Sequence, residues 1–511
     1  MPYAERMNTL SRRHLLQAAL AAGCAPLFSR HALAADLDRF GFGLASGFPR
    51  PDGMVLWTML TGGKLPAQVA VDWELAEDEG FQRVVARGSE WAVPEDNFSV
   101  HAEPQGLAAD RWYWYRFTAL GQQSRTGRTR TAPALDAPVD RLRFALASCQ
   151  RFDHGRYAAW GDCAAREHDV VFFVGDYIYE TATPSNSKTQ RPHNGPRCQT
   201  LADYRARHAQ YRADPLLQAA HARAPWIIIW DDHDIENDWA GNVSERLTEH
   251  FERQRANAAK AYWEYLPFPK SRRPDAYNML IHERIDWGRL ARVITLDDRQ
   301  YRDQQVCPKP GTGGGNTVNS AECPALLDRS RTLLGAAQER WLAAQWDDNR
   351  PWNLLAQQTM MAGLNWETDA AKPEVRWTEG WDGYLGARER LLADLAARRV
   401  PNAVVLGGDV HANYVCDLRA TPKGPIVASE FCGTSITSEG LKQERIDKVV
   451  PFNPDIKYAR ADDRGYMSFE LRPGRLDMEM RRVDDIWKAD STISSAGRYV
   501  VEAGKAGPQR A

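Results

Sequence analysis

The hydrophobic and polar positions of the chain follow two different rhythms. From Gly41 to Ala132, short aromatic and β-branched runs, such as residues 54–58, 69–73 and 112–117, alternate with turn-rich breaks. Short strands at regular spacing with turns between them are typical of an antiparallel β-sandwich. We therefore expect a small all-β domain in this part of the chain.

Beyond a proline-containing linker at residues 133–140, continuous apolar runs alternate with helical stretches such as residues 330–348 and 387–399. Uninterrupted apolar runs of this length favour strands that are covered on both faces. Five runs are predicted as strands: residues 144–148, 170–174, 226–230, 293–296 and 404–406. This alternation predicts a layered α/β domain, with β-sheets flanked by helices.

The two rhythms divide the 511 residues into four expected segments. A chain of this length exceeds what one hydrophobic core organises, so two domains are expected. The segments are a signal peptide at residues 1–34, a fibronectin-like β-sandwich domain at 37–135, an α/β catalytic domain at 141–490 and a C-terminal tail at 491–511.

The N-terminal segment has the composition of an export signal. Arg12 and Arg13 are followed by two leucines, an apolar run to Phe28 and small residues up to Ala34, which is the order of a charged region, an apolar region and a cleavage site. The adjacent arginines resemble a twin-arginine signal, whose pathway carries folded proteins. We therefore expect the twin-arginine export machinery as a partner, cleavage near Ala34 and a periplasmic or secreted protein. Cys24 offers a lipidation site as an alternative.

The remaining composition narrows the possible partners. No later stretch approaches the roughly 18 consecutive apolar residues of a membrane span, so no transmembrane segment is expected in the mature chain. Signal cleavage would change the net charge from −2 to −5. A negative chain without a basic patch does not favour nucleic acid as a partner.

Seven cysteines remain after cleavage of the signal. An odd number in an oxidising compartment leaves one unpaired. Cys307 and Cys323 bracket a glycine-rich loop and are the first predicted disulfide, because a flexible loop gains most from a staple. Cys149 is expected to be the unpaired cysteine, and the pairing of the other four stays open.

Potential ligands follow each of the five strands predicted for the α/β domain. In layered α/β folds, ligands bind beyond the carboxyl ends of the strands. A single aspartate there is usually a turn or helix-cap residue, but the coincidence at five strands indicates a site. The candidates are Cys149 after the first strand, Asp176 and Tyr179 after the second, Asp231, Asn237 and Asp238 after the third, Asp297 after the fourth, and Asp409 and His411 after the fifth.

These residue types point to a multinuclear metal centre. Thiolate, phenolate and imidazole groups select transition metals over magnesium, so Cys149 and Tyr179 together indicate ferric iron, Fe3+. Aspartate and asparagine oxygens are hard ligands that suit Ca2+, Mg2+ or Mn2+. Cleavage of a phosphoester needs a hydroxide at neutral pH and positive charge near the phosphoryl oxygens, and paired metal ions provide both.

The motifs also carry a family likeness. Gly-Asp-x-x-Tyr at residues 175–179 and Gly-Asp-x-His at 408–411 resemble the calcineurin-like metallophosphoesterases and purple acid phosphatases. With Ser-Cys-Gln at 148–150 and the acidic stretch at 230–239, the chain is similar to the PhoD-like alkaline phosphatase and phosphodiesterase family. The likeness covers nearly the whole chain, and it implies a metallophosphoesterase-type catalytic domain after a small β-sandwich.

The resemblance also implies a set of ligands. Fe3+ would be held by Cys149, Asp176 and Tyr179, with Ca2+ ions alongside. Asp231, Asp409 and His411 would complete the cluster. The family usually places two asparagines before the tryptophan of the third motif, whereas Asn237 is followed here by Asp238, so the choice between these two residues stays open.

Two residues are expected to act on the substrate. Arg156 could hold a phosphate through two parallel hydrogen bonds, and His233 could meet the phosphate or orient a neighbouring ligand. The segments 181–199 and 307–323 are expected to form the mouth of the site.

The sequence therefore predicts a secreted metal-dependent alkaline phosphatase and phosphodiesterase, which hydrolyses phosphomonoesters and phosphodiesters through attack by metal-bound oxide or hydroxide. Alkaline working conditions follow from the resemblance alone. Two alternatives stay open: a phospholipase of phosphodiesterase type, and a non-catalytic, calcium-stabilised extracellular binding protein.

Overall fold

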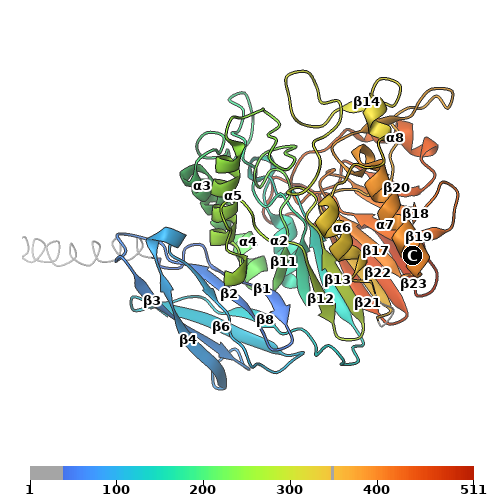
Figure 1. The fold of residues 1–511 in the computed structure, drawn as a ribbon. Helices are drawn as coiled ribbons and strands as arrows, with labels where there is room; N and C mark the ends of the chain where they lie inside the picture. The colour runs from blue at the N-terminus through green and yellow to red at the C-terminus, as the bar shows by residue number, and fades with distance from the viewer. Residues whose placement is uncertain (1–37, 347–349) are drawn as a thin grey trace, which may run out of the picture.

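Two large β-sheets form the centre of the molecule (Figure 1). The computed structural model describes residues 38–346 and 350–511, so the expected signal peptide lies outside the described residues. One sheet has ten strands in the order β24-β23-β22-β21-β9-β10-β11-β1-β2-β5, and the other has seven in the order β12-β13-β15-β17-β19-β18-β20.

The five strands predicted for the α/β domain are confirmed and divide between the two sheets. In the ten-stranded sheet, β9 (Leu142–Ala147), β10 (Val170–Phe173) and β11 (Trp226–Ile228) pair in parallel. In the seven-stranded sheet, β13 (Ala291–Thr295) and β17 (Ala403–Gly407) both pair in parallel with β15 (Trp352–Ala356). Parallel neighbours point their carboxyl ends the same way, so the loops that follow them meet at one edge of each sheet.

Alternation along the strands explains why the sheets stack face to face. Val404 and Leu406 of β17 belong to the core that also holds Phe144 and Leu146 of β9, in the other sheet. Val405 faces the opposite way, into a second core. Side chains of a strand alternate between its two faces, so a fully apolar strand fills the space on both sides.

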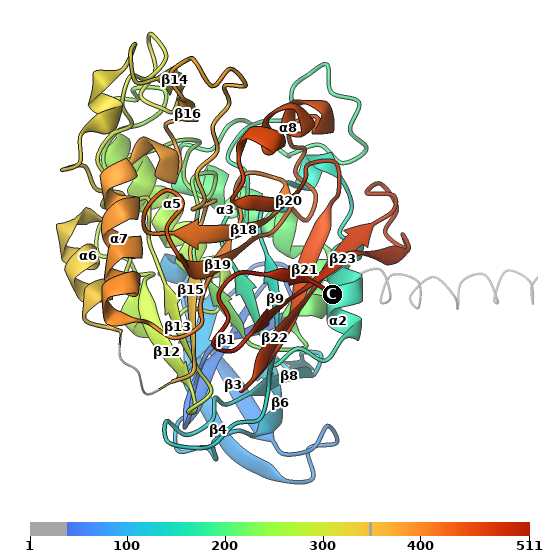
Figure 2. The same ribbon diagram turned by 90° about the vertical axis from the view of Figure 1, so that its right-hand side faces the viewer.

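Helices cover the outer faces of the sheets, as Figure 2 shows with α6 and α7 on one side and α2 on the other. The predicted helix at 330–348 is shorter in the structure, while the one at 387–399 is confirmed as α7. The helices are α2 (Ala158–Ala165), α3 (Leu201–Arg212), α4 (Pro215–His221), α5 (Phe251–Tyr265), α6 (Gly335–Ala343), α7 (Leu385–Arg398) and α8 (Gln443–Val449).

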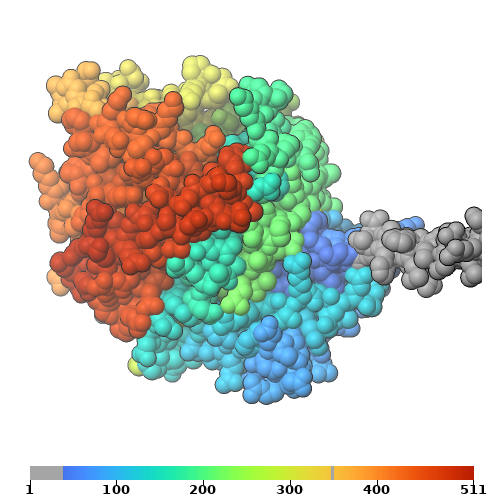
Figure 3. Space-filling model, turned by 180° about the vertical axis from the view of Figure 1, so that it is seen from behind, coloured from blue at the N-terminus to red at the C-terminus, as the bar shows by residue number. Residues whose placement is uncertain are grey.

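The N-terminal region packs directly against one end of the molecule (Figure 3). Its five-stranded sheet faces the three N-terminal strands of the ten-stranded sheet and shares a core with them. Strand β1 pairs in parallel with β11, so one layer of the expected sandwich continues the catalytic sheet. The strands are β1 (Leu44–Arg50), β2 (Gly53–Met59) and β5 (Ser99–Ala102) in the large sheet, and β3 (Val69–Ala76), β4 (Val84–Ala92), β6 (Trp112–Ala119), β7 (Gln122–Gln123) and β8 (Gly127–Arg130) in the small one.

The C-terminal residues correct the expectation of a tail at 491–511. They form β23 (Ile493–Glu502) and β24 (Gln509–Arg510) at the edge of the ten-stranded sheet. β23 begins with small and polar residues before its apolar end, and it lies between β22 and the short edge strand β24. The other strands of the two sheets are β12 (Glu283–Trp287), β18 (Asn413–Arg419), β19 (Ile426–Cys432), β20 (Ile456–Arg460), β21 (Gly465–Arg472) and β22 (Arg475–Val483).

Cysteine chemistry agrees with the sequence in two respects. Cys307 and Cys323 form the predicted disulfide, and Cys149 is unpaired and buried. The four cysteines whose pairing the sequence left open are also free and buried. None of the helices in the described part of the chain has the length and apolar character needed to cross a membrane.

Several histidines are buried in the core, which predicts a loss of stability in acid. Burial lowers the pKa of His101 and His168 from 6.5 to about 4 and that of His208 to about 3. In the unfolded chain these histidines bind protons near pH 6.5, whereas in the folded chain they stay neutral to a lower pH. The histidines therefore do not affect stability well above pH 6.5, and the free energy of unfolding falls as the pH drops toward 4. Neither ring nitrogen of His208 has a hydrogen-bond partner among the described residues.

We expect His208→Phe to raise the thermal unfolding midpoint relative to the parent at pH 5, with a smaller difference at pH 7.5. The substitution removes a histidine that the folded protein keeps neutral, together with two buried ring nitrogens that have no hydrogen-bond partner among the described residues. Replacing the exposed His250 with glutamine is the control. Parallel pH profiles for His208→Phe and the parent would contradict this account.

Candidate metal centre and active site

The loops that follow the parallel strands meet between the carboxyl ends of the two sheets. The backbone N–H groups of Cys149 and Gln150 donate to the carbonyls of Gly175 and Asp176, which ties the first two loops together. Gly175 has a φ of +117°, and an added Cβ would lie 2.3 Å from Cβ of Asp231. Only glycine fits there, because the second and third loops touch through their backbones.

Asp234 holds these loops in register. One of its carboxylate oxygens accepts the backbone N–H groups of Asp176 and Asp231, both at 2.9 Å, and the other accepts that of Ile178 at 3.1 Å. A buried carboxylate that bonds three backbone donors fixes the segments that carry them. Asp234 therefore positions two candidate ligands.

A first group of possible ligands joins the two sheets. Sγ of Cys149, a carboxylate oxygen of Asp176 and a ring nitrogen of His411 lie within 4.8 Å of one another. The Tyr179 hydroxyl lies 3.0 Å from Nε2 of His411. Nδ1 of His411 donates to the Glu439 carbonyl at 2.6 Å, which leaves Nε2 as the nitrogen with a lone pair.

Three further groups of possible ligands share Asp232, each with all ligand atoms within 4.8 Å of one another. They extend the site away from Cys149, because Asp176 links the first group to the next. These sets are Asp176, Asp232 and His233; Asp231, Asp232 and Asp409; and Asp232, Asp238 and Glu379.

The backbone at the site is unusual for residues with side chains. Cys149, Asp176, Asp238, Asp409 and His411 all have a φ between +52° and +66°. A left-handed conformation is uncommon outside glycine, and such outliers concentrate at functional sites. Five of them among the candidate ligands show that the fold holds these side chains in place against local preference.

The buried acids crowd one another. Burial raises the pKa of Asp176 to about 7, with repulsion from Asp232 adding to it. Burial and the Glu379 carboxylate raise the pKa of Asp238 to about 7. The pKa of Asp409 is likewise raised by burial and by Glu379. The site therefore holds more negative charge than the protein alone accommodates.

One arginine supplies most of the balancing charge within the described residues. Arg299 is fully buried, and its Nε lies 2.5 Å from Oδ1 of Asp231 while Nη1 bonds Glu379. Arg302 adds a second contact to Glu379 at 2.8 Å. Oδ2 of Asp231 and Oε2 of Glu379 nevertheless have no hydrogen-bond partner in the part of the chain that the structure describes.

These orphaned oxygens are what a metal site requires. Buried carboxylate oxygens are normally hydrogen-bonded or coordinate a cation. Burial also raises the pKa of the Cys149 thiol and of the Tyr179 phenol, so both need a strong positive charge nearby to ionise. The donor set therefore fits a thiolate- and phenolate-binding cation beside one or more cations that prefer oxygen.

His233 is a second cationic side chain beside the ligands. Burial alone would lower its pKa, but the carboxylates of Glu180, Asp232 and Asp176 raise it to about 10. Nδ1 of His233 lies 2.7 Å from Glu180, and the centre of its ring lies 4.2 Å from that of the tilted Tyr179 ring. His233 is thus held as a hydrogen-bond donor at the edge of the metal cluster.

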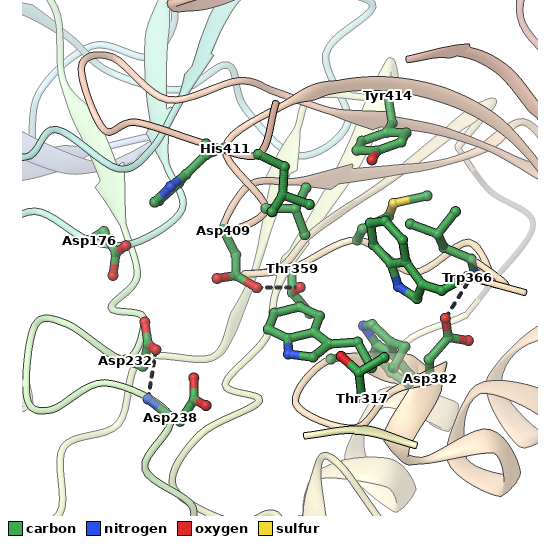
Figure 4. Close-up of a pocket in the computed structure, with 18 of the residues that line it drawn as sticks. Asp176, Asp232, Asp238, Thr317, Thr359, Trp366, Asp382, Asp409, His411 and Tyr414 are labelled. Atoms are coloured by element: carbon green, nitrogen blue, oxygen red, sulfur yellow. Dashed lines mark hydrogen bonds between the residues drawn. The ribbon is translucent and has the colours of Figure 1, made fainter. Parts of the chain in front are cut away.

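A cavity of about 400 Å³ opens onto these residues (Figure 4). Asp176, Asp232, His233, Asp409 and His411 line it. Of the two segments expected to form the mouth, 307–323 contributes Thr317, whereas residues of 184–190 line a neighbouring groove.

Asp297 belongs to none of the candidate ligand groups found among the described residues. The carboxylate of Asp297 accepts the backbone N–H groups of Arg299 and Gln300, both at 3.0 Å, so it shapes the turn that aims Arg299 at the cluster. Arg156 precedes α2 and is not among the residues that line the cavity. Shaping a turn is the ordinary role of a strand-end aspartate.

Asn237 and Asp238 both stay candidate ligands. Both line the cavity, and the carboxylate of Asp238 joins a candidate ligand group with Asp232 and Glu379. Gly315 donates its backbone N–H to Oδ2 of Asp238 at 2.8 Å.

Sequence reasoning missed three residues of the site. Asp232 follows the predicted ligand Asp231, and the pattern could not tell which of two adjacent carboxylates turns inward. Glu180 directly follows the predicted ligand Tyr179, and the pattern likewise could not tell whether its side chain points toward the site. Glu379 lies in a loop after β16 (Val375–Trp377) and follows none of the five predicted strands, so no sequence signal marks it.

Comparison with known proteins places the chain beside one group of phosphatases. The PhoD-like phosphatase family matches residues 144–480, and its N-terminal domain matches residues 26–133. Alkaline phosphatase D of Bacillus subtilis (strain 168) is 38% identical over 486 residues, which cover 92% of this chain and 82% of that protein. A solved structure of PhoD superposes with a TM-score of 0.87 at 37% identity, covering 92% of each chain.

Proposed function

We propose, from the premise that this chain belongs to the PhoD-like phosphatase family, that it is an exported, metal-dependent alkaline phosphatase that hydrolyses phosphomonoesters and phosphodiesters. The observation that carries the metal dependence is the excess of buried carboxylates around Asp232, two of which have unpaired oxygens. A phosphate ester would be repelled by this site without cations, because both carry negative charge.

The donor atoms divide naturally between two kinds of ion. Cys149, Tyr179 and His411, together with Asp176, would hold Fe3+. The remaining carboxylates, those of Asp231, Asp232, Asp238, Glu379 and Asp409, suit Ca2+. When bound, the cations supply a nucleophile from water and positive charge for the phosphoryl oxygens.

The chain's own groups contribute positioning and proton control. His233, held by Glu180, lines the cavity as a donor for a phosphoryl or leaving-group oxygen. Thr359 donates its hydroxyl to Asp409 at 2.6 Å, which fixes the orientation of that carboxylate. Cleavage near Ala34 and export by the twin-arginine route remain part of the proposal, since a metal centre assembled before export suits a pathway for folded proteins.

Metal removal tests the proposal directly. We expect the purified protein to hydrolyse 4-nitrophenyl phosphate and bis(4-nitrophenyl) phosphate, to lose roughly 100-fold or more of this activity in a chelator, and to recover with added Ca2+. Metal analysis should find iron and calcium, with a visible absorbance from tyrosinate bound to iron. A colourless, zinc-loaded protein that leaves both substrates intact would contradict the proposal.

A further inference from the structure

The cavity has two chemically different sides. In Figure 4, Asp176, Asp232 and Asp238 lie on one side, while Trp366 and Tyr414 lie on the other. Trp377, Trp381 and Leu364 also line the cavity. The acidic side accounts for metal and phosphate, whereas the aromatic side has no role in the function proposed above.

The two sides are directly adjacent. The hydroxyl of Thr359 donates to Asp409, and Gly380 lies next to Thr359. A Cβ added to Gly380 would lie 3.3 Å from Oγ1 of Thr359 and 3.6 Å from the ring of Trp377. One glycine therefore separates the metal cluster from the aromatic side chains. A group attached to a phosphate at the cluster would reach Trp377.

The aromatic rings are held in place. Nε1 of Trp381 donates to Gln357 at 3.0 Å. The backbone of Trp366 bonds Val375 at 2.8 Å, and the Arg445 guanidinium lies 4.6 Å from the centre of the Trp366 ring. Fixed rings lose little conformational entropy when a ligand binds.

The disulfide supports the same wall. Trp377 belongs to β16, which pairs with β14 (Thr317–Asn319) through the register of Trp377 with Thr317. Strand β14 lies inside the loop closed by Cys307 and Cys323. The stapled loop thus positions both Thr317 and Trp377 at the cavity.

The acid on this side is already neutralised. Oδ1 of Asp382 pairs with the guanidinium groups of Arg376 at 2.8 Å and Arg388 at 2.7 Å. The other oxygen of Asp382 accepts the backbone N–H of Leu364. It is therefore not free to bind a cation or repel a substrate. What this side presents to a ligand is mainly the indole surface of Trp366 and Trp377, which are half-buried.

We propose that this aromatic wall, in which Trp366 and Trp377 are half-buried and Trp381 and Tyr414 are buried behind them in the lining, is a subsite for the organic group of the ester and selects phosphate esters that carry an aromatic ring, with Trp366 and Trp377 as the rings that contact it. The inference rests on the proposed function, because the acidic side must bind the phosphoryl group. A volume of about 400 Å³ is within the usual range of small-molecule pockets. Stacking on fixed indole rings gives the preference.

Two phosphonates that differ by one phenyl ring provide the test. Methylphosphonate and benzylphosphonate resist hydrolysis, so intrinsic reactivity of the ester does not enter the comparison. For the metal-loaded parent, we expect the inhibition constant of benzylphosphonate to be about ten-fold lower than that of methylphosphonate. In Trp366→Ala and Trp377→Ala, the ratio should fall below about three-fold while methylphosphonate inhibits as in the parent.

Matched variants separate this role from general stability. Trp91 is 61% exposed on β4, and Trp91→Ala should keep the parent ratio. Trp366→Leu, which keeps apolar bulk, should give an intermediate ratio and serves if the alanine variant does not fold. Equal inhibition of the parent by both phosphonates, or an unchanged ratio in the Trp366 and Trp377 variants, overturns the subsite alone. Failure of methylphosphonate to bind at all overturns the proposed function and the subsite together.

Discussion

Replacing Asp176 with asparagine is expected to lower kcat/KM for phosphate esters by roughly 10³-fold, since this carboxylate is shared by two of the candidate ligand groups. An asparagine keeps the shape and can still accept the backbone N–H of His233, which lies 3.2 Å from Oδ1 of Asp176. The loss should therefore come from charge, not from folding. Steady-state kinetics and metal content would be measured together.

The stability of the same variant distinguishes these causes. Burial raises the pKa of Asp176 to about 7, so its ionised form destabilises the metal-free fold above that pH. After chelation at pH 8, Asp176→Asn should unfold at a temperature no lower than the parent. Asp72→Asn, on the exposed side of β3, is the control with unchanged activity. A variant at Asp176 that retains full activity and metal would exclude this residue as a ligand.

The second large effect concerns Arg299. Replacing it with methionine should destabilise the protein by about 3–5 kcal/mol, because one buried cation balances several buried carboxylates, which would be left uncompensated. Its guanidinium contacts Asp231 at 2.5 Å and Asp298 at 3.7 Å, and it bonds Glu379. Urea unfolding of the parent and the variant would measure the difference.

A double substitution identifies the reason for that loss. Adding Glu379→Gln to Arg299→Met removes one of the carboxylates that would lose its buried cation. The double substitution should therefore lower the free energy of unfolding by less than the sum of the two single substitutions. Arg398→Met, which breaks an exposed pair with Asp394, should change stability little. If Arg299→Met proved as stable as Arg398→Met, the carboxylates would have to be balanced in another way.

Strand positions were accessible from the sequence because they depend on local pattern. An apolar run such as 226–230 is long enough for a strand and too short for a helix, and the structure places β11 there. The same reasoning failed at β23, where a run of small and polar residues was predicted to be a tail. This strand is stabilised by pairing with β22 and β24, and a local pattern does not show such neighbours.

The division between the two sheets was also beyond the sequence. Five similar apolar runs do not reveal that β9, β10 and β11 belong to one sheet and β13 and β17 to another. Nor does the aromatic rhythm of residues 41–132 show that β1 pairs with β11. Pairing between distant strands depends on tertiary contacts, which local composition does not encode.

The sequence by itself determined the chemical inventory: a thiol, a phenol, an imidazole and several carboxylates, each following a buried strand, with the family motifs around them. Only the tertiary structure decided which of these meet. Adjacent residues such as Asp231 and Asp232 turn to different partners according to backbone conformation, and Glu379 and Arg299 reach the cluster from loops 80 residues apart. Proximity within 4.8 Å is a property of packing, and packing is set by the whole core rather than by any one segment.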